Sequence, residues 1–550
     1  MNTNTKQVDA IFAQWDKPDT PGCVLGIIKE GELIYTRGYG MANLDYDIPI
    51  NAGSVFRIAS MSKQFTAACI LLLAQRGELS LDDNLRQYVP EIPDYGHTIT
   101  LRHLIHHTSG LRNNFTLMNL SGQTLEGYYD NEDMTALMAR QKALDFRPGD
   151  EHVYCNSGYV LLAEIVKRIS GQSLKQFAQE NIFTPLSMNN TQFADDHTRV
   201  VKNRVTSYGR NAQGGLRRFL ITDDLVGPTG LLSTATDLYR WDQNFYHAQV
   251  GGPEFVAQML EPGRLNNGKE LHYASGLALG AYRGLRMVWH GGKMFGFRSQ
   301  MIRFPQQAFS VICLSNQEGF SPARRIQQVA DIYLAEAFPE PKAKFIELPA
   351  STLEEALGVY GDESIGFFVE FFRRQEKWMM EVFGSPVPVA PVESIRTKQG
   401  EMIVLQELGG PFAMIFRLQR PATGEPWFLD MEMSFHKPPR LFPLEIDAPD
   451  ADRFTEYVGA YTSDELQTTH KIILQDNSLR VRIGGNPATP LRPGRGDFFR
   501  VEGGALRFTR DEMGQVTGLT RTGAMARNIH FKMNRQLTNE SANSQGDKLR

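Results

Sequence analysis

The sequence changes character near residues 337–351, where prolines and charged residues replace periodic apolar residues in "AFPEPKAKFIELPAS". Before this stretch, segments of helical and of strand-like spacing follow one another. After it, short alternating runs such as "GFFVEFF", "MIVLQEL" and "FAMIFRL" predict a succession of antiparallel strands. A chain of 550 residues is also too long for one hydrophobic core. We therefore expect an α+β domain followed by all-β structure.

The all-β part contains an internal repeat. "LGVYGDES" begins at Leu357 and "VGAYTSDE" begins at Val458, and each places Gly-x-Tyr just before an acidic turn. Tyr360 and Tyr461 are 101 residues apart in the numbering. This period predicts two related antiparallel units, barrels or sandwiches, and we favour barrels. A second break at "PLEIDAPDAD" separates them, and the predicted domains are 1–338, 346–444 and 452–536.

The first domain has strands at both ends and helices between them. "CVLGIIKEGELIYTRGYG" predicts two strands around a turn at Lys29-Glu30-Gly31. "SGYVLLAEIVKRISG", from Ser157 to Gly171, predicts an amphipathic helix closed by glycine. "LRMVWHGG" and "SVICLSN" predict short apolar strands late in the domain. This order favours a layered α+β domain.

A serine and a lysine stand three residues apart in "RIASMSKQFTA", as Ser60 and Lys63. If Ser60 begins the helix that follows, both side chains lie on one face, one turn apart. A serine hydroxyl needs a nearby proton acceptor to act as a nucleophile, and a helix N-terminus stabilises an oxyanion. The ordinary alternative is a helix cap with a solvated lysine. Ser62 competes as a nucleophile, but no lysine lies three residues after it.

Two further motifs follow in the chain. "VYCNSGY" contains Tyr154 and Asn156 at the entrance of the predicted helix, where a buried tyrosine and a helix cap are the alternative. A nearby cation such as Lys63 would make the phenol a better base by lowering its pKa. "VWHGGKMFGF" contains His290, Gly292 and Lys293 after a strand, where a chance turn is the alternative.

The three motifs together resemble those of β-lactamases and penicillin-binding proteins, which carry Ser-x-x-Lys, Ser/Tyr-x-Asn and Lys-Thr-Gly-type elements in this order. Ser60, Tyr154 and His290 are separated by 94 and 136 residues. "LRHLIHHTSGL", "FRPGDEHVYCNSGYVLLAEIVKRISG" and "GPTGLLSTATDLYRW" also resemble stretches of class C β-lactamase-like serine hydrolases. This resemblance covers residues 8–335 and implies that family's fold for the first domain.

The combination of Tyr-x-Asn, His-x-Gly and two C-terminal barrels resembles the D-aminopeptidases (D-stereospecific aminopeptidases). "YTSDEL" and "HGGKMFGFRSQ" resemble the corresponding stretches of that family. In the family, a loop from the last barrel reaches the active site. At "RIGGNPATPLRPGRGD", residues 482–497, this chain is shorter, a departure that bears on substrate preference.

The resemblance implies a role for each motif residue. Ser60 would form an acyl-enzyme, with Lys63 and Tyr154 sharing the base role and Tyr154 returning the proton to the leaving group. Asn156 would hold a substrate amide and orient Lys63. The backbone N–H groups of Ser60 and Lys293 would bind the oxyanion. His290 and Gly292 would complete the substrate and oxyanion residues. His290 stands where a lysine would anchor a substrate carboxylate, so we expect substrates without an obligatory terminal carboxylate.

Four functions remain open from the sequence. The first is a D-aminopeptidase releasing N-terminal D-amino acids from peptides or amides. The second is an esterase or β-lactamase-like hydrolase of broad specificity that uses the same Ser-Lys-Tyr site. The others are a DD-carboxypeptidase and a non-catalytic binding protein that kept the fold. A nucleophile-elbow hydrolase is disfavoured because the chain has no G-x-S-x-G.

Composition limits the partners and cofactors that we expect. The net charge of −4 gives no basic field for nucleic acid or an anionic membrane. We expect no cofactor, and a small-molecule or short-peptide substrate, with a homodimer as one open assembly. The N-terminal sequence has no signal-peptide pattern and the four cysteines form no CxxC pair, so we expect a cytoplasmic protein with free thiols.

Three closely spaced histidines form a candidate metal site. His103, His106 and His107 lie on a predicted helix at positions i, i+3 and i+4, so they would share one face. The stretch lacks the glutamate of an inverzincin motif, and it belongs to the serine hydrolase resemblance. We therefore expect no metal.

Overall fold

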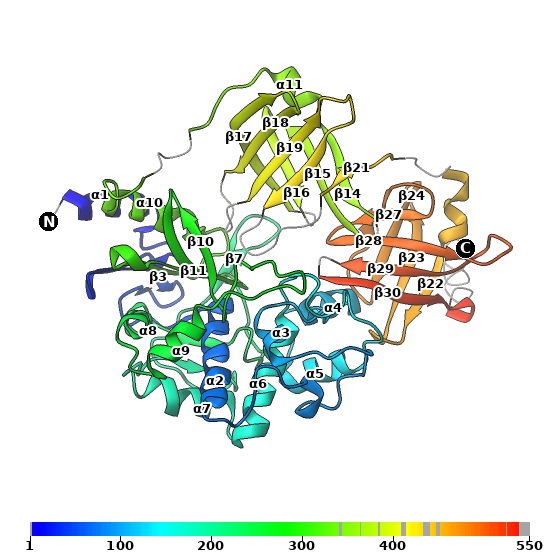
Figure 1. Ribbon diagram of the computed structural model, residues 1–550. Coiled ribbons are helices and arrows are strands. Elements are labelled where there is room, and N and C mark those ends of the chain that lie inside the picture. Colours follow the sequence, from blue (N-terminus) through cyan, green and yellow to red (C-terminus); the bar gives the residue numbers. More distant parts are fainter. Residues whose placement is uncertain are drawn as a thin grey trace. The chain divides into compact units, whose positions relative to one another are not determined.

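The structure is a computed structural model of the chain. It describes residues 3–339, 344–363, 365–382, 385–408, 414–432, 440–446, 451–523 and 525–537. The chain divides into two compact units. Figure 1 shows their helices and strands, coloured along the sequence. Unit 1 is Met1–Leu111, Leu125–Ala136 and Phe146–Lys342, and unit 2 is Arg112–Thr124, Leu137–Asp145 and Ala343–Arg550. The predicted breaks at 337–351 and 443–452 lie partly outside the described residues.

Unit 1 is built on a six-stranded antiparallel sheet in the order β10-β11-β12-β13-β1-β2. Its strands are β1 Cys23–Lys29, β2 Glu32–Tyr39, β10 Ala278–Tyr282, β11 Leu285–Met294, β12 Phe297–Phe304 and β13 Phe309–Ser315. β1 pairs with β13 along its whole length, so strands from both ends of the domain sequence join in one sheet. The predicted hairpin turns at Glu30 and Gly31, both of which adopt positive φ. The α+β prediction is confirmed.

Helices bury this sheet. α8 (Ala235–His247) contacts β1 and β13, and α10 (Pro322–Tyr333) contacts β12 and β13. β12 and β13 are buried at every position, which requires cover on both faces. A strand covered on both faces carries consecutive apolar residues instead of an alternating pattern, which explains the run "SVICLSN".

Two further helices form the interior of unit 1. α2 (Lys63–Gln75) is buried from its first residue to Leu73, and α6 (Asn156–Ser170) contacts it. α6 ends at Gly171, whose left-handed conformation closes the helix, as predicted. Other helices of unit 1 are α1 Thr3–Phe12, α3 Leu101–Ile105, α7 Leu174–Ala178 and α9 Gly252–Met259, and α5 Asn131–Ala139 runs from unit 1 into unit 2. Short strands are β3 Met41–Asn43, β4 Ile48–Pro49, β5 Phe56–Arg57, β6 Gln192–Phe193, β7 Tyr208–Arg210, β8 Leu216–Arg218 and β9 Leu231–Ser233.

Unit 2 contains two nearly closed antiparallel barrels. The first has the order β20-β19-β18-β17-β16-β15-β14-β21 and follows α11 (Ala350–Glu354). Leu429 and Leu441 exchange both backbone hydrogen bonds, at 2.9 Å each, which brings β20 next to the segment that enters β21. Its strands are β14 Gly358–Asp362, β15 Phe367–Arg374, β16 Lys377–Val382, β17 Ser385–Thr397, β18 Gly400–Glu407, β19 Ile415–Pro421, β20 Phe428–Glu432 and β21 Phe442–Pro443.

The second barrel has the order β25-β24-β23-β22-β30-β29-β28-β27-β26. β25 and β26 are separated by Leu491 alone, so the two ends of the sheet adjoin. Its strands are β22 Gly459–Ser463, β23 Thr468–Gln475, β24 Ser478–Ile483, β25 Thr489–Pro490, β26 Arg492–Pro493, β27 Phe498–Val501, β28 Gly504–Arg510, β29 Val516–Gly523 and β30 Ala526–Met533. The prediction of barrels is confirmed.

The repeat is visible in the hydrogen bonds of the two barrels. Tyr360 on β14 donates its phenol hydrogen to the carbonyl of Ala356 at 2.7 Å. Tyr461 on β22 donates to the carbonyl of Tyr457 at 2.8 Å. Both tyrosines are buried, and each bonds four residues back, into the helical turn that precedes the first strand of its barrel. The shared sequence pattern therefore encodes the same local anchor twice.

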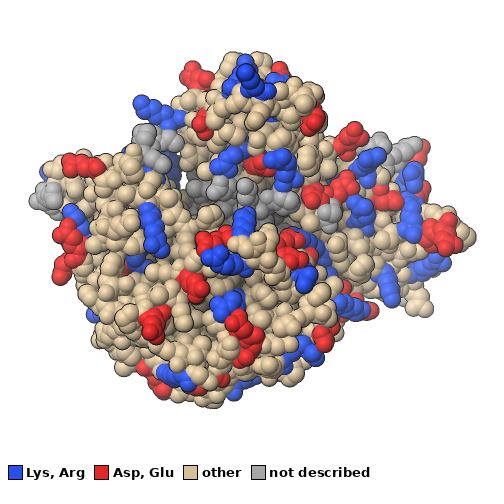
Figure 2. Space-filling model, viewed as in Figure 1, with Lys and Arg blue, Asp and Glu red and all other residues tan. Residues whose placement is uncertain are grey.

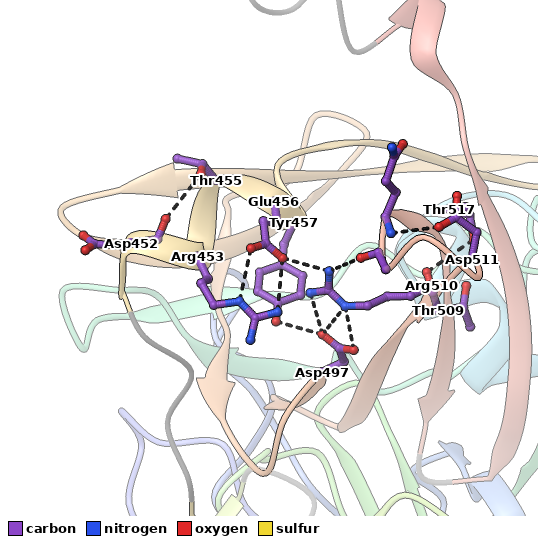
Figure 3. Close-up of polar contacts among 12 residues, drawn as sticks. Asp452, Arg453, Thr455, Glu456, Tyr457, Asp497, Thr509, Arg510, Asp511 and Thr517 are labelled. Carbon is purple, nitrogen blue, oxygen red and sulfur yellow. Dashed lines mark hydrogen bonds and ion pairs between the residues drawn. The ribbon is translucent and has the colours of Figure 1, made fainter.

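An ionic network fastens the helical turn Ala451–Tyr457 to the second barrel (Figure 3). Arg510, at the end of β28, makes ion pairs with Asp497 at 2.9 Å and with Glu456 at 2.8 Å. Tyr457 donates its phenol hydrogen to Asp497 at 2.8 Å. Burial alone would raise the pKa of Asp497, but the hydrogen bonds from Arg510 and Tyr457 outweigh it and lower that pKa. The carboxylate thus stays charged where the chain enters β27.

Two segments from the first 150 residues belong to unit 2. Asn113 donates its backbone N–H to the carbonyl of Met525 at 2.9 Å, and α4 (Asn114–Ser121) follows. At the end of α4, the carbonyl of Leu120 accepts a hydrogen bond from Nε2 of His470 at 2.8 Å. These contacts join residues more than 300 positions apart in the chain. Unit 2 therefore includes segments from the middle of the first domain's sequence, which contact the second barrel.

The four cysteines, which all lie in the described part of the chain, are buried thiols outside any disulfide. In the part of the chain that the structure describes, no helix combines the length and the apolar character needed to cross a membrane. On the face shown in Figure 2, the Lys and Arg side chains are interspersed with Asp and Glu side chains.

Candidate active site

Ser60 lies in a tight helical turn between a strand and a helix. β5 leads into the 3₁₀ turn Ala59–Ser62, and α2 begins directly afterwards at Lys63. Ala59 has a φ of +49°, a left-handed conformation that costs a residue with a side chain strain energy. Ser60 thus lies in the 3₁₀ turn that precedes α2, one turn from Lys63. The distance between Lys63 Nζ and Ser60 Oγ is 3.3 Å.

Lys63 is buried and makes two further hydrogen bonds. Its Nζ donates to Oδ1 of Asn156 at 2.7 Å and to the carbonyl of Pro228 at 2.9 Å. Burial lowers the pKa of Lys63 well below its ordinary value, because the charged ammonium is removed from water. Neither bonded oxygen carries a formal charge that would offset this cost. A lowered pKa makes the neutral amine, which can accept a proton, accessible near neutral pH.

Ser62 is used in the local structure. Its hydroxyl donates to the carbonyl of Ala59 at 2.6 Å and accepts from the backbone N–H of Leu231 on β9 at 3.1 Å. Ser62 is fully buried, whereas Ser60 is partly exposed. Of the two serines in the turn, Ser60 is therefore the one that a substrate can reach.

Tyr154 immediately precedes the residue that caps α6, and Asn156 is the first residue of that helix. Its phenol shares a hydrogen bond with Ser60, and its ring centre is 4.7 Å from Lys63 Nζ. Burial raises the pKa of Tyr154, and the hydrogen bond with Ser60 opposes the rise only in part. Our expectation that a lysine lowers this pKa is wrong for the free site. Tyr154 therefore carries its proton when Lys63 is neutral.

His290 lies on β11 and is buried. Its Nδ1 donates to the carbonyl of Gly291 at 2.7 Å, so Nε2 accepts from the hydroxyl of Tyr273 at 3.1 Å. Burial, followed by repulsion from Lys63, lowers the pKa of His290 to about 3. The ring is neutral at physiological pH, as we expected from the histidine at this motif position.

Gly292 lets β11 approach the turn that carries Ser60. A Cβ at this position would lie 2.3 Å from the carbonyl oxygen of Ile58 and 2.4 Å from Oγ of Ser299. Ser299 donates to the same carbonyl at 2.7 Å, which ties β12 to the turn. Only glycine fits this contact, which gives Gly292 of the third motif a physical reason. Lys293 follows on β11 with an exposed side chain.

The structure also brings in residues that we did not assign from the sequence. Tyr273 contacts His290, and the ring of His107 lies 4.3 Å from the ring of Tyr154, centre to centre. We placed His103, His106 and His107 on one helix, which is wrong. α3 ends at Ile105, and His107 has a φ of +58°. Among the described residues, the structure contains no group of three metal-ligating side chains. The only signal for His107 was the resemblance of "LRHLIHHTSGL" to a serine hydrolase stretch.

The cluster combines a reachable serine hydroxyl, a buried amine with a lowered pKa and a protonated phenol. These are the groups needed to activate a nucleophile and to protonate a leaving group. The sequence of the domain agrees with this chemistry, because the model of the beta-lactamase family matches residues 8–334, more than half of the chain. The chain belongs to the beta-lactamase family. It is a serine hydrolase of that family.

Several curated relatives are similar to this member of the family. The chain is 31% identical to penicillin-binding protein 4* of Bacillus subtilis (strain 168) over 304 residues, which is 52% of this chain and 66% of that protein. It is 27% identical to a D-aminopeptidase of Gluconobacter oxydans (strain 621H) over 297 residues, which is 54% of this chain and 56% of that protein. These matches thus span less than two thirds of either relative.

One match extends through both barrels. The chain is 23% identical to a D-aminopeptidase of Brucella canis (strain ATCC 23365 / NCTC 10854 / RM-666) over 527 residues, which is 93% of this chain and 95% of that protein. Among solved structures, the octameric penicillin-binding protein homologue from Pyrococcus abyssi is similar with a TM-score of 0.56 and 22% identity. That similarity covers 80% of this chain and 100% of the other, and it concerns the fold.

Proposed function

We propose that this serine hydrolase is a D-aminopeptidase, which releases N-terminal D-amino acids from peptides or amides through an acyl-enzyme on Ser60. The observation that carries the catalytic part is the position of Lys63, buried between Ser60, Asn156 and Pro228. The substrate class is supported by the similarity to a D-aminopeptidase along 93% of the chain, barrels included.

Lys63 acts as the base in the first step. A neutral amine has two N–H groups and one lone pair. The oxygens of Asn156 and Pro228 accept the two N–H groups at 2.7 and 2.9 Å, which leaves the lone pair for the hydroxyl of Ser60 at 3.3 Å. The Ser60 proton moves to Lys63 while Oγ forms a bond with the substrate carbonyl carbon. Because the amine of Lys63 is buried, it stays neutral until it accepts this proton.

Tyr154 acts as the acid in the second step. When the tetrahedral intermediate collapses, the bond between the carbonyl carbon and the leaving nitrogen breaks. The phenol of Tyr154 gives its proton to that nitrogen, and the proton held by Lys63 restores the phenol. Water then attacks the ester on Ser60, with the same two groups moving its proton in reverse order. The raised pKa of Tyr154 keeps the phenol protonated until the amine departs.

The oxyanion would be held by the backbone N–H groups of Ser60 and Lys293. The contact at Gly292 supports this proposal, because β11 approaches the Ser60 turn closely enough to exclude a Cβ. Asn156 would bond the substrate amide through its Nδ2 while its Oδ1 orients Lys63. Donors fixed by the fold stabilise the developing charge without reorganising.

The neutral His290 bears on substrate choice. A lysine at this position would attract a substrate carboxylate, whereas His290 has both ring nitrogens occupied by Gly291 and Tyr273 and carries no charge. The side chain at position 290 therefore offers no charge to a substrate carboxylate. This favours peptides and amides recognised by their free ammonium end over substrates recognised by a carboxylate.

An esterase or β-lactamase-like hydrolase of broad specificity is the second candidate on the same residues. The identity of 31% to a penicillin-binding protein over the catalytic domain favours it. It predicts turnover of simple esters or β-lactams and no preference between the enantiomers of an amino acid amide.

A panel of four substrates tests these candidates. D-alanine p-nitroanilide, its L enantiomer, p-nitrophenyl acetate and a chromogenic cephalosporin are assayed with wild type, Ser60→Ala and Ser62→Ala. We expect turnover of the D-anilide well above the L-anilide, its loss in Ser60→Ala, and its retention in Ser62→Ala, which loses only buried hydrogen bonds. Equal rates on the two anilides contradict the aminopeptidase proposal, and turnover of the ester alone favours the second candidate. Full activity in Ser60→Ala contradicts the mechanism itself.

A further inference from the structure

His107 holds an unusual place beside the candidate active site. It is buried, it follows the end of α3, and its φ of +58° is rare for a residue with a side chain. Strained residues persist only where the surrounding contacts hold them, and they occur often at functional sites. The contacts that hold His107 in place include those made with Tyr154 and with the residues on either side of it.

His107 binds the backbone on both sides of Tyr154. Its carbonyl oxygen accepts the N–H of Val153 at 3.0 Å, and its Nδ1 accepts the N–H of Cys155 at 3.1 Å. Its ring centre lies 4.3 Å from that of Tyr154, with the ring planes 43° apart. One residue thus binds the backbone N–H of the residue before Tyr154 and that of the residue after it, and its ring packs against the phenol ring.

The chemistry of the His107 ring is fixed by these contacts. Because Nδ1 accepts a hydrogen bond, the neutral ring carries its proton on Nε2. Burial, together with His152, Lys63, His290 and His106, lowers the pKa of His107 well below its ordinary value, so the ring stays neutral. In the described part of the chain Nε2 is buried and makes no hydrogen bond. The ring therefore accepts a hydrogen bond from the backbone of Cys155 through Nδ1 and packs against the ring of Tyr154.

We propose that His107 is a positioning residue, which holds the hydroxyl of Tyr154 toward Ser60. This inference rests on the proposed function, in which Tyr154 donates the proton to the leaving group. Without the contacts from His107, the phenol of Tyr154 can move away from the reacting atoms while the substrate still binds. A reduced kcat with little change in KM is the expected signature, since the phenol contributes to the chemical steps.

Two substitutions separate the acceptor from the bulk of the ring. His107→Phe keeps a ring of similar shape and removes the acceptor for Cys155. His107→Asn places a side-chain oxygen near the position of Nδ1, and asparagine tolerates positive φ better than most residues. We expect His107→Phe to lose about 10- to 100-fold in kcat on D-alanine p-nitroanilide, part of the gain that acid–base catalysis supplies. We expect His107→Asn to recover most of that loss.

His106→Phe is the matched control. His106 is a buried neighbour whose ring is also kept neutral by burial, but it contacts Gly263 and not the Tyr154 backbone. Its replacement is expected to change thermal stability and leave the ratio of kcat to KM near that of wild type. If His107→Phe does not fold, His107→Gly relieves the strain, and added imidazole is expected to restore part of the rate. Folded His107→Gly with wild-type kcat, or with no gain from imidazole, contradicts the proposal.

A double-mutant cycle with Tyr154→Phe decides whether His107 acts through Tyr154. If it does, adding His107→Phe to Tyr154→Phe causes no further loss of kcat, because the group being positioned is already absent. A further loss as large as in the wild-type background overturns the positioning role and leaves the proposed function intact. Full activity of the single variant Tyr154→Phe contradicts the proposed role of Tyr154 as the acid. This result does not depend on any substitution of His107.

Discussion

Nζ of Lys63 lies 2.7 Å from Oδ1 of Asn156, an uncharged oxygen. This pairing satisfies the amine without supplying a counter-charge, so burial dominates and lowers the pKa of Lys63. A carboxylate in the same place would reverse the balance, since an opposite charge at this distance favours the ammonium. The choice of amide over carboxylate at position 156 therefore sets the protonation of the proposed base.

Asn156→Asp is expected to move the activity profile to higher pH. The new carboxylate raises the pKa of Lys63, so the neutral amine appears only at higher pH and the acidic limb of kcat/KM shifts up by about 1–3 units. The measurement is kcat/KM on D-alanine p-nitroanilide across pH. Asn156→Leu is the control, because it removes the oxygen without adding charge and is expected to show no such shift. An acidic limb at the wild-type position in Asn156→Asp contradicts the base role of Lys63.

Lys63→Met is expected to change how stability depends on pH. Lys63 has a lowered pKa in the folded state, so between that value and 10.5 folding releases a proton. In this window the wild-type stability rises with pH by about 1.4 kcal/mol per unit for one proton, and methionine removes this contribution. The advantage of Lys63→Met over wild type in free energy of unfolding should therefore shrink as pH rises. Denaturant unfolding at pH 6 to 9 measures it, and parallel curves for the two proteins rule the shift out.

Gly292→Ala is expected to impair activity more than Gly291→Ala. The added methyl of Gly292→Ala meets the backbone carbonyl of Ile58 and pushes β11 away from the Ser60 turn, at a cost of about 1–3 kcal/mol. At Gly291 the nearest atom is the end of the Gln300 side chain, which can rotate away. Thermal unfolding and kcat on the anilide measure both variants. Similar losses in the two would show that the approach of β11 to the turn is unimportant.

Arg112→Met is expected to destabilise unit 2. Arg112 is buried with two buried carboxylates, Glu465 at 2.5 Å and Asp145 at 3.6 Å. Removing one partner from a buried ionic cluster typically costs about 3–5 kcal/mol, because the remaining charges stay buried without it. Denaturant unfolding followed by tryptophan fluorescence measures the loss.

Arg453→Met is the control for this cluster. Arg453 pairs with Glu456 at 3.1 Å on the surface of the same unit, and exposed pairs contribute about 0–1 kcal/mol. Equal stabilities for the two variants would contradict the importance of burial at Arg112.

Local patterns predicted much of the fold. The hairpin at Glu30-Gly31 and the helix closed by Gly171 depend on residues that favour these conformations by themselves. The two barrels were predicted from alternating apolar residues, and their relation was predicted from one tyrosine pattern. Tyr360 and Tyr461 each bond to a carbonyl four residues away, so the sequence contains the whole interaction.

The relation between the site residues depended on contacts that no local pattern encodes. The spacing of Ser60 and Lys63 indicated the pair, but Ser62 differs from Ser60 through a bond to Leu231, 169 residues away. The direction of the pKa shift of Tyr154 was also missed, because burial is a property of the packed site and the nearby lysine suggested the opposite.

The sequence by itself determined most of the elements, the repeat and the residue types of the site. Only the tertiary structure decided that His107 contacts Tyr154 and its neighbours, that Lys63 is bonded to uncharged oxygens, and that Arg112 pairs with Glu465 in unit 2. The physical reason is the distance along the chain between the residues that interact. Helices, turns and strand patterns follow from neighbouring residues, whereas burial, hydrogen-bond partners and the protonation that they set arise when distant segments exclude water from one another.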